Sequence, residues 1–281
     1  MKRALLIGIN YTGTQNQLNG CINDIKNINN VLTKSCDYQS SNIRILTDET
    51  NIKPTRANME SNIKWLASNC VAGDILFFYY SGHGSQIKDT TNDETDGLDD
   101  VLVPLDYGTK GIISDDWLYQ NLAALLPQGV TLWAFTDCCH SGTMLDLQYN
   151  LKCNSTYTKG TVNQNVKYNS VEWTNQFSFA NERSKVTTAN VYLISGCLDS
   201  QTSADAYLKN QSQGAFTCCF LEFIANNSTT LPNGIPKFNS GSKKIVDVIK
   251  EVNCRLTIKN FNQRPQLSMG KVQDINVPFY I

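Results

Sequence analysis

The stretch Val130-Thr-Leu-Trp-Ala-Phe-Thr-Asp-Cys-Cys-His-Ser-Gly142 decides the fold that we expect for this chain. Its first part, Val130 to Phe135, is apolar with little polar alternation, which is typical of a strand buried on both faces of a parallel sheet. An acid, two thiols and a glycine then end the run abruptly. The pattern predicts a strand that delivers a cysteine to its carboxyl end, where open α/β sheets bind their ligands.

A second apolar run has the same form. Asp74-Ile-Leu-Phe-Phe-Tyr-Tyr80 is followed by Ser81-Gly-His-Gly84, which leaves an imidazole at the end of another buried strand. A nearby imidazole activates a thiol as a nucleophile. The glycines on both sides of His83 allow the backbone to approach a substrate closely. We therefore expect His83 and Cys139 to face each other.

Other interpretations of these residues stay open. A cysteine at a strand end is often a small buried hydrophobe, and His140 is an alternative base. The chain has two histidines, His83 and His140, and both follow these strands, which favours a chemical role. The adjacent Cys138 and Cys139 also suggest a redox-sensing pair, although neighbouring cysteines form strained disulfides.

Composition excludes several classes of function. A chain of 281 residues with 24 basic and 25 acidic residues has a formal net charge of −1, which gives no global case for nucleic acid or membrane partners. The apolar run at the N-terminus is short, and no stretch approaches a membrane span, so we expect a cytoplasmic protein without a signal peptide. The ten cysteines are expected to be mostly reduced and buried, and two histidines make a zinc site improbable. We expect no organic cofactor.

Hydrophobic periodicity predicts alternating strands and helices. Such alternation is typical of a parallel sheet in the α/β class. The expected strands are residues 4–9, 43–46, 74–80, 130–135, 191–194 and, at the end of the chain, 277–281. The expected helices begin at Cys21, at Pro54-Thr55 and at Ser114, and two more cover residues 214–225 and 243–256. The remaining expectations are a hairpin through residues 107–111, a long surface connector from 144 to 185 and a polar turn at 201–206.

Acidic residues are concentrated in two loops before the cysteine. The segment 88–105 contains six acids that repel one another unless they are solvated or neutralised. An EF-hand does not fit, because Val103 stands where a bidentate glutamate is needed. Ser114 is a plausible N-cap, so helix capping explains Asp115 and Asp116, with a Ca²⁺ site of oxygen ligands as the alternative.

Together these motifs resemble the metacaspases, a family of caspase-like cysteine peptidases, over nearly the whole chain. Tyr79-Tyr-Ser-Gly-His-Gly84 resembles the family's histidine motif, and Asp137-Cys-Cys-His-Ser-Gly142 resembles its cysteine motif with Cys138 in place of a serine. Further similar segments are Leu18-Asn-Gly-Cys-Ile-Asn-Asp24, Ser195 to Asp205 and Gln263-Arg-Pro-Gln-Leu-Ser268.

The resemblance implies a caspase-like three-layer sandwich, in which helices flank a central, mostly parallel sheet. It implies one peptidase domain over residues 1–281, with a large-subunit-like part (1–150), a connector (151–188) and a small-subunit-like part (189–281). It also implies a monomer, and the chain looks like a form without an N-terminal prodomain. The sequence leaves open whether the connector is cleaved by the protein itself at basic residues such as Lys152 or Arg183.

Site residues follow from the same resemblance. Cys139 is the implied nucleophile and His83 the general acid or base, with backbone N–H groups of Gly84 and Cys139 holding the oxyanion. Asp24, Ser81 and Asp137 match an acidic S1 pocket, which implies protein or peptide substrates with Arg or Lys before the scissile bond. Asp99, Asp115, Asp116 and Asp146 match Ca²⁺ ligands. The rivals are a catalytically silent relative that binds partners and an arginine-directed cysteine peptidase of another branch.

Overall fold

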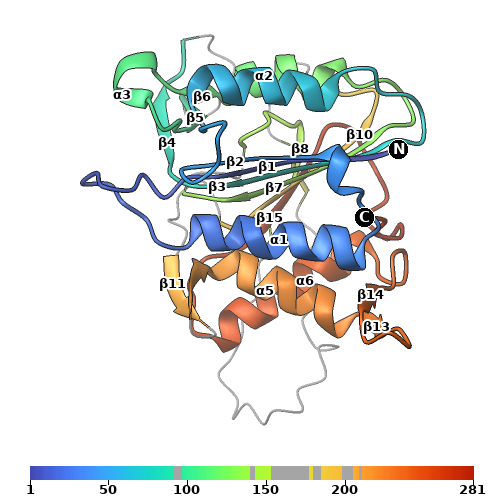
Figure 1. Ribbon diagram of the computed structural model, residues 1–281. Helices are drawn as coiled ribbons and strands as arrows, with labels where there is room; N and C mark the ends of the chain where they lie inside the picture. The colour runs from blue at the N-terminus through green and yellow to red at the C-terminus, as the bar shows by residue number, and fades with distance from the viewer. Residues whose placement is uncertain (91–96, 140–142, 153–176, 180–184, 198–204, 209–210) are drawn as a thin grey trace.

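An eight-stranded sheet forms the centre of the molecule (Figure 1). Its spatial order is β2 (Ile43–Thr47), β1 (Lys2–Gly8), β3 (Ile75–Ser81), β7 (Thr131–Asp137), β10 (Asn190–Ser195), β15 (Gln266–Met269), β8 (Tyr149–Lys152) and β9 (Phe177–Phe179). Strands β2 to β10 in this order are parallel, and the last three pair antiparallel. The computed structural model describes residues 1–90, 97–139, 143–152, 177–179, 185–197, 205–208 and 211–281.

Helices cover both faces of this sheet. On one face lie α1 (Cys21–Ser35), α5 (Ala215–Asn226) and α6 (Ile245–Ile258), and on the other lie α2 (Arg56–Ala67) and α4 (Asp115–Asn121) (Figure 1). The structure therefore confirms the expected three-layer α/β sandwich with a mostly parallel sheet. Thr55 and Ser114 cap α2 and α4 with their side chains, as their positions before the helices indicate.

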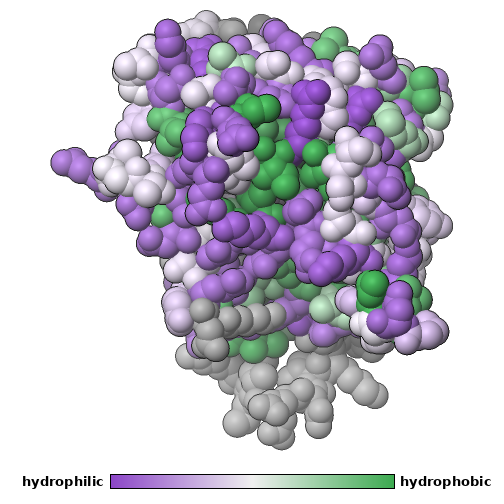
Figure 2. All heavy atoms as spheres, in the orientation of Figure 1, coloured by the Kyte–Doolittle hydropathy of each residue, from purple (hydrophilic) through white to green (hydrophobic). Residues whose placement is uncertain are grey.

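The apolar runs of the central strands are explained by the two helix layers. In β3, Phe77 and Tyr79 belong to the apolar cluster with α1, α5 and α6, whereas Leu76, Phe78 and Tyr80 belong to the cluster with α2 and α4. Successive side chains of a strand point to opposite faces, so a strand covered on both sides is apolar throughout. Outside this core the face seen in Figure 2 is mainly hydrophilic, with apolar residues grouped in a recess between the helix layers.

Shorter elements decorate the ends of the sheet. They are β4 (Gly84–Lys88), β5 (Leu98–Leu102) and β6 (Ile113–Ser114) in one small sheet, the pair β11 (Asp205–Leu208) and β12 (Gln211–Gly214), the pair β13 (Ser228–Thr230) and β14 (Pro236–Phe238), the short helix α3 (Tyr107–Lys110), and 3₁₀ turns at Ser40–Asn42 and Ala123–Leu125. In the described part of the chain, each helix is too short or too polar to cross a lipid bilayer.

Four local predictions were wrong. The expected hairpin at 107–111 is helix α3, whose last turn closes through a bond from the Gly111 N–H to the Tyr107 carbonyl, with Gly111 at a φ of 77°. The expected terminal strand forms a single bridge between Pro278 and Lys244, because a proline nitrogen carries no hydrogen to extend the ladder. Residues 205 and 206, expected in a polar turn, begin β11, and residues 201–204 lie outside the described ranges.

The fourth error concerns the segment 144–185, which we expected to be a surface connector. It contributes β8 and β9 to the central sheet. Strand β8 pairs with β15, Lys152 lying opposite Gln266, so its partner is far away in the chain. A strand whose pairing is this remote leaves no local period in the sequence. Arg183, the second residue named above for self-cleavage, lies outside the described residues.

Candidate active site

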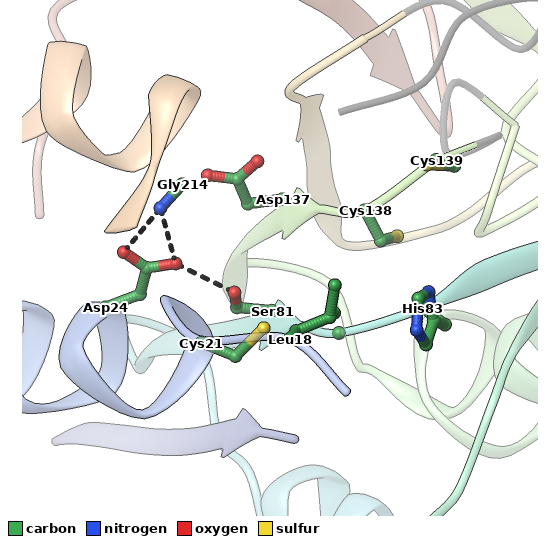
Figure 3. Close-up of a pocket in the computed structure, with 10 residues that line it drawn as sticks. Leu18, Cys21, Asp24, Ser81, His83, Asp137, Cys138, Cys139 and Gly214 are labelled. Atoms are coloured by element: carbon green, nitrogen blue, oxygen red, sulfur yellow. Dashed lines mark hydrogen bonds between the residues drawn. The ribbon is translucent and has the colours of Figure 1, made fainter. Parts of the chain in front are cut away.

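The two strands that carry the predicted pair end side by side. Ser81 at the end of β3 lies in register with Asp137 at the end of β7. His83 and Cys139 each follow two residues later, and both line one cavity of about 160 Å³ (Figure 3). The cavity is also lined by Leu18, Cys21, Asp24, Ser81, Gly82, Asp137, Cys138 and Gly214. The structure therefore brings the predicted catalytic residues and the predicted S1 residues to one place.

Gly84 shows why the chain needs glycine beside the histidine. A Cβ atom built on Gly84 would lie 2.0 Å from the Cys139 carbonyl oxygen and 3.2 Å from Cys138 Sγ. Any side chain at position 84 would push the histidine strand away from the cysteine strand. The close approach also places the backbone of Gly84 beside that of Cys139, the two residues expected to hold the oxyanion.

His83 is held by the loop that follows β1. Its Nε2 lies 2.7 Å from the Asn16 carbonyl oxygen, and its backbone N–H donates to Tyr11 Oη at 3.0 Å. A carbonyl oxygen only accepts hydrogen bonds, so Nε2 carries the hydrogen and a neutral ring has its lone pair on Nδ1. The rings of Tyr11 and His83 pack in a tilted arrangement with 4.7 Å between centroids, which restricts the position of the imidazole. Nδ1 is thereby available as the proton acceptor.

Two buried aspartates line the cavity on the side away from His83 (Figure 3). Asp24 in α1 accepts hydrogen bonds from Ser81 Oγ at 2.8 Å and from the Gly214 N–H at 3.0 Å. A Cβ atom on Gly214 would lie 2.0 Å from an oxygen of Asp137 and 3.0 Å from one of Asp24, so both carboxylates border this glycine. The arrangement forms a small acidic pocket next to the thiol and the imidazole.

The start of α5 explains why the two carboxylates converge. Gly214 is the N-cap of α5 and has no side chain to accept from the first N–H groups of the helix. Asp137 supplies that acceptor, because it receives the Thr217 N–H at 2.9 Å and Thr217 Oγ1–H at 2.7 Å. The positive end of the helix dipole also favours negative charge here. Asp137 therefore caps the start of α5 and lines the pocket at the same time.

Cys138 and Cys139 have different surroundings. Cys138 is 1% exposed, and burial, reinforced by neighbouring Cys197 and Cys139, raises the pKa of its thiol well above the usual value. Cys139 is partly exposed beside the cavity. Nine described cysteines, these two included, are present as thiols. A thiolate is the reactive species, so the contrast favours Cys139 as the nucleophile. His140, the alternative base, lies outside the described residues.

Comparison with known proteins gives the family. The model of the metacaspase peptidase C14 domain matches residues 2–148. Over 99% of its length the chain is 37% identical to metacaspase-1 of Debaryomyces hansenii, covering 67% of that protein, and over all of its length it is 35% identical to metacaspase-1 of Mycosarcoma maydis, covering 73%. This chain belongs to the metacaspase family.

A solved structure supports the fold of this metacaspase. A protein from Geobacter sulfurreducens superposes with a TM-score of 0.63 over 99% of this chain and 97% of its own, at 24% identity. The two chains therefore share the fold of helices flanking a mostly parallel sheet. Membership of the metacaspase family, with its peptidase C14 domain, makes this chain a cysteine peptidase.

The expected Ca²⁺ residues are only partly gathered. Asp115 and Asp146 are both buried. Burial, and next to it the nearby charge of Asp146, raises the pKa of Asp115 to about 9. Asp116 and Asp146 are bridged by the Lys185 ammonium. Asp99 is buried in β5, next to Asp100. Among the described residues, no group of three or more His, Cys, Asp or Glu side chains is arranged as a metal site. The ligand set therefore stays a prediction.

Several residues that shape this site have no local signal in the sequence. Tyr11, Asn16, Gly214 and Thr217 hold His83, Asp24 and Asp137 of the metacaspase cavity from a loop or from the start of a helix. Tyr11 has one indirect signal, since it follows Asn10 just after the first buried strand, at the same edge of the sheet as His83. The others act through backbone groups or a single hydroxyl, which no spacing rule selects.

Proposed function

We propose that this metacaspase is an endopeptidase that cleaves proteins after Arg or Lys through Cys139 and His83, and that Ca²⁺ activates it. The observation that supports the proposal is the single cavity lined by the thiol, the imidazole and the carboxylates of Asp24 and Asp137. A guanidinium or ammonium in the acidic pocket would place the following carbonyl carbon beside Cys139. Paired carboxylates bind such cations through charge-assisted hydrogen bonds and repel aspartate.

In the proposed reaction His83 twice accepts a proton and passes it on. The Cys139 thiol gives its proton to Nδ1, and the sulfur attacks the carbonyl carbon while the backbone N–H groups of Gly84 and Cys139 hold the oxyanion. The C–N bond breaks as the leaving amine takes the proton from His83. Water then loses a proton to His83 as its oxygen adds to the thioester carbon. The C–S bond breaks as His83 returns that proton to the sulfur, which releases the acid product and restores the thiol.

The calcium part of the proposal rests on the carboxylate groups that lie near one another in this protein. Carboxylate oxygens are the ligands that this hard cation prefers. Asp116 and Asp146 already hold one cationic group, the ammonium of Lys185, and Asp115 lies close to Asp146. Asp99 would complete the proposed set from β5. Bound Ca²⁺ would neutralise the repulsion among these acids and order the loops that carry them.

Peptides that differ only in the residue before the scissile bond test the proposal. We expect cleavage after Arg and Lys. For peptides with Asp before the scissile bond, kcat/KM should be at least about 10²-fold lower, because the carboxylates of the pocket repel the substrate's carboxylate and offer it no cation. Chelation of Ca²⁺ should lower the rate. Equal cleavage after Asp would contradict the proposed specificity, whereas indifference to chelator would contradict only the role of calcium.

Thr217 offers a test of how the S1 pocket is held. Its hydroxyl donates to Asp137 and accepts from Tyr79, whose pKa is raised by burial and by Asp24 and Asp137, so that Tyr79 keeps its proton. Replacing Thr217 with Val removes one hydrogen bond to a charged acceptor at constant shape, which is worth about 1.5–3 kcal/mol. We expect KM for Arg peptides to rise about 10-fold with little change in kcat.

Thr217→Ser is the matched control, because it keeps the hydroxyl. It should retain the parent KM. If Thr217→Val lowers kcat and leaves KM unchanged, Thr217 does not act through the substrate pocket.

A further inference from the structure

Lys185 bridges two of the acidic residues described above, Asp116 and Asp146. Its Nζ lies 2.6 Å from Asp116 Oδ1 and 2.5 Å from Asp146 Oδ2, and its side chain is 12% exposed. Asp146 is fully buried and Asp116 largely so, with its side chain 19% exposed. The ion pairs of Lys185 are therefore largely buried. Salt screens such pairs much less than it screens ion pairs on the exposed surface.

The backbone around Lys185 is fixed by separate contacts. The Val186 carbonyl accepts the hydroxyl of Tyr119 at 2.9 Å, and the Thr187 N–H donates to the Gly270 carbonyl at 2.8 Å. These bonds hold the chain that leads into β10 without using the ammonium. The Lys185 side chain can therefore leave the carboxylates by rotation, because the backbone that carries it is anchored independently.

More acids lie next to the bridge. Asp115 and Asp100 are buried, and Asp115 accepts the Asp100 N–H at 2.6 Å and the Asp116 N–H at 2.8 Å. The two carboxylates that Lys185 bridges thus adjoin two further buried acids. Ca²⁺ binds six to eight oxygen atoms. The Lys185 ammonium has no oxygen to offer the ion, and its N–H groups already donate to the oxygens of Asp116 and Asp146. A divalent cation and the ammonium would compete for the same atoms.

We propose that Lys185 is an internal cation that competes with Ca²⁺ for Asp116 and Asp146, so that calcium binds only when the ammonium withdraws. The lysine sets the calcium concentration at which the site fills and neutralises the carboxylates when calcium is absent. This inference rests on the calcium part of the proposed function and is independent of the peptidase chemistry.

Calorimetric titration with Ca²⁺ tests the competition. The parent for this test carries Cys139→Ala, so that self-cleavage and activity play no part. Adding Lys185→Met should lower the Kd for Ca²⁺ about 10-fold or more, since close charge pairs couple by at least that much. The same variant should melt at a lower temperature than its parent in chelator and gain more from Ca²⁺.

Two control variants separate charge from position. Lys185→Arg keeps the cation and should bind Ca²⁺ as weakly as the parent does. Lys271→Met removes an exposed ammonium that donates to the Thr188 carbonyl of the same segment, and it should leave the Kd unchanged. A gain in affinity with Lys271→Met as large as with Lys185→Met would show an effect of the segment and overturn the proposal.

Chemical labelling measures the same event in the protein with Lys185 intact, so the inference stays testable if Lys185→Met does not fold. An amine-reactive reagent followed by peptide mapping should modify Lys185 slowly in chelator and several-fold faster with saturating Ca²⁺, with Lys271 unchanged. Protection of Lys185 at saturating Ca²⁺, or an unchanged Kd in Lys185→Met, would overturn the competition while leaving the calcium site intact. Absence of calcium binding in both parent and variant would overturn the calcium site itself, and the proposed peptidase would stand.

Discussion

Replacing Cys139 with alanine is expected to abolish cleavage of Arg and Lys peptides, with kcat/KM falling by about 10³-fold or more. The sulfur is the atom that forms the acyl bond in the proposed reaction, and no other atom of the side chain can replace it. Cys139 is partly exposed beside His83 in the cavity, so the change removes the nucleophile without opening a hole in the core. Initial rates with a fluorogenic Arg peptide measure the loss.

Cys138→Ala is the matched control for this experiment. Cys138 is buried, and burial holds its thiol in the protonated form by raising its pKa, so it should contribute packing and little chemistry. The variant should keep most of the activity and melt at a slightly lower temperature. Activity that survives Cys139→Ala but disappears in Cys138→Ala would move the nucleophile by one residue. Loss in both variants would favour the rival thiol-pair interpretation.

Asp137→Asn is expected to lower kcat/KM for Arg peptides by about 10²-fold or more, the second largest effect that we predict. Leaving a bound cation without one of its buried charged partners costs about 2–5 kcal/mol. The amide has the shape of the carboxylate and its oxygen still accepts from Thr217, so the start of α5 stays capped. Steady-state kinetics with matched Arg and Leu peptides separate lost recognition from lost folding, because the Leu peptide should lose little.

Asp274→Asn serves as the control for charge alone. Asp274 is an exposed aspartate that lies near the opposite, amino end of the parallel strands and accepts from Asn276. The same chemical change there should leave both peptides unaffected. An equal loss for Arg and Leu peptides in Asp137→Asn would mean that Asp137 supports the structure of the site and does not select the substrate.

Much of the fold could be predicted because a strand that is buried on both faces consists almost entirely of apolar residues. The runs that became β1, β3, β7 and β10 are apolar on both faces, and the helices between them have one apolar side. Strands β8 and β15 could not be found in this way. They are four residues each and form by pairing with remote partners, so their structure depends on the sheet that they join.

In the candidate site, too, the residues that follow apolar strands could be predicted, and those that depend on distant contacts could not. His83 and Cys139 were predicted because parallel strands in register bring their carboxyl ends together, and the registered pair Ser81 and Asp137 confirms that geometry. Asp24, Asp137 and the calcium residues came from family resemblance, and their roles stay predictions. Tyr11, Gly214, Thr217 and Lys185 were missed, since each acts through a contact with residues far away in the chain.

The amino-acid sequence by itself determined which strands are buried and which two reactive side chains follow them, because the run of apolar residues that marks a strand covered on both faces lies within the strand itself. Only the tertiary structure decided that the start of α5 draws Asp24 and Asp137 into one pocket and that an ammonium lies between Asp116 and Asp146. Those arrangements depend on unsatisfied helix N–H groups and on charges that meet only after the layers have packed, and no stretch of sequence contains both partners.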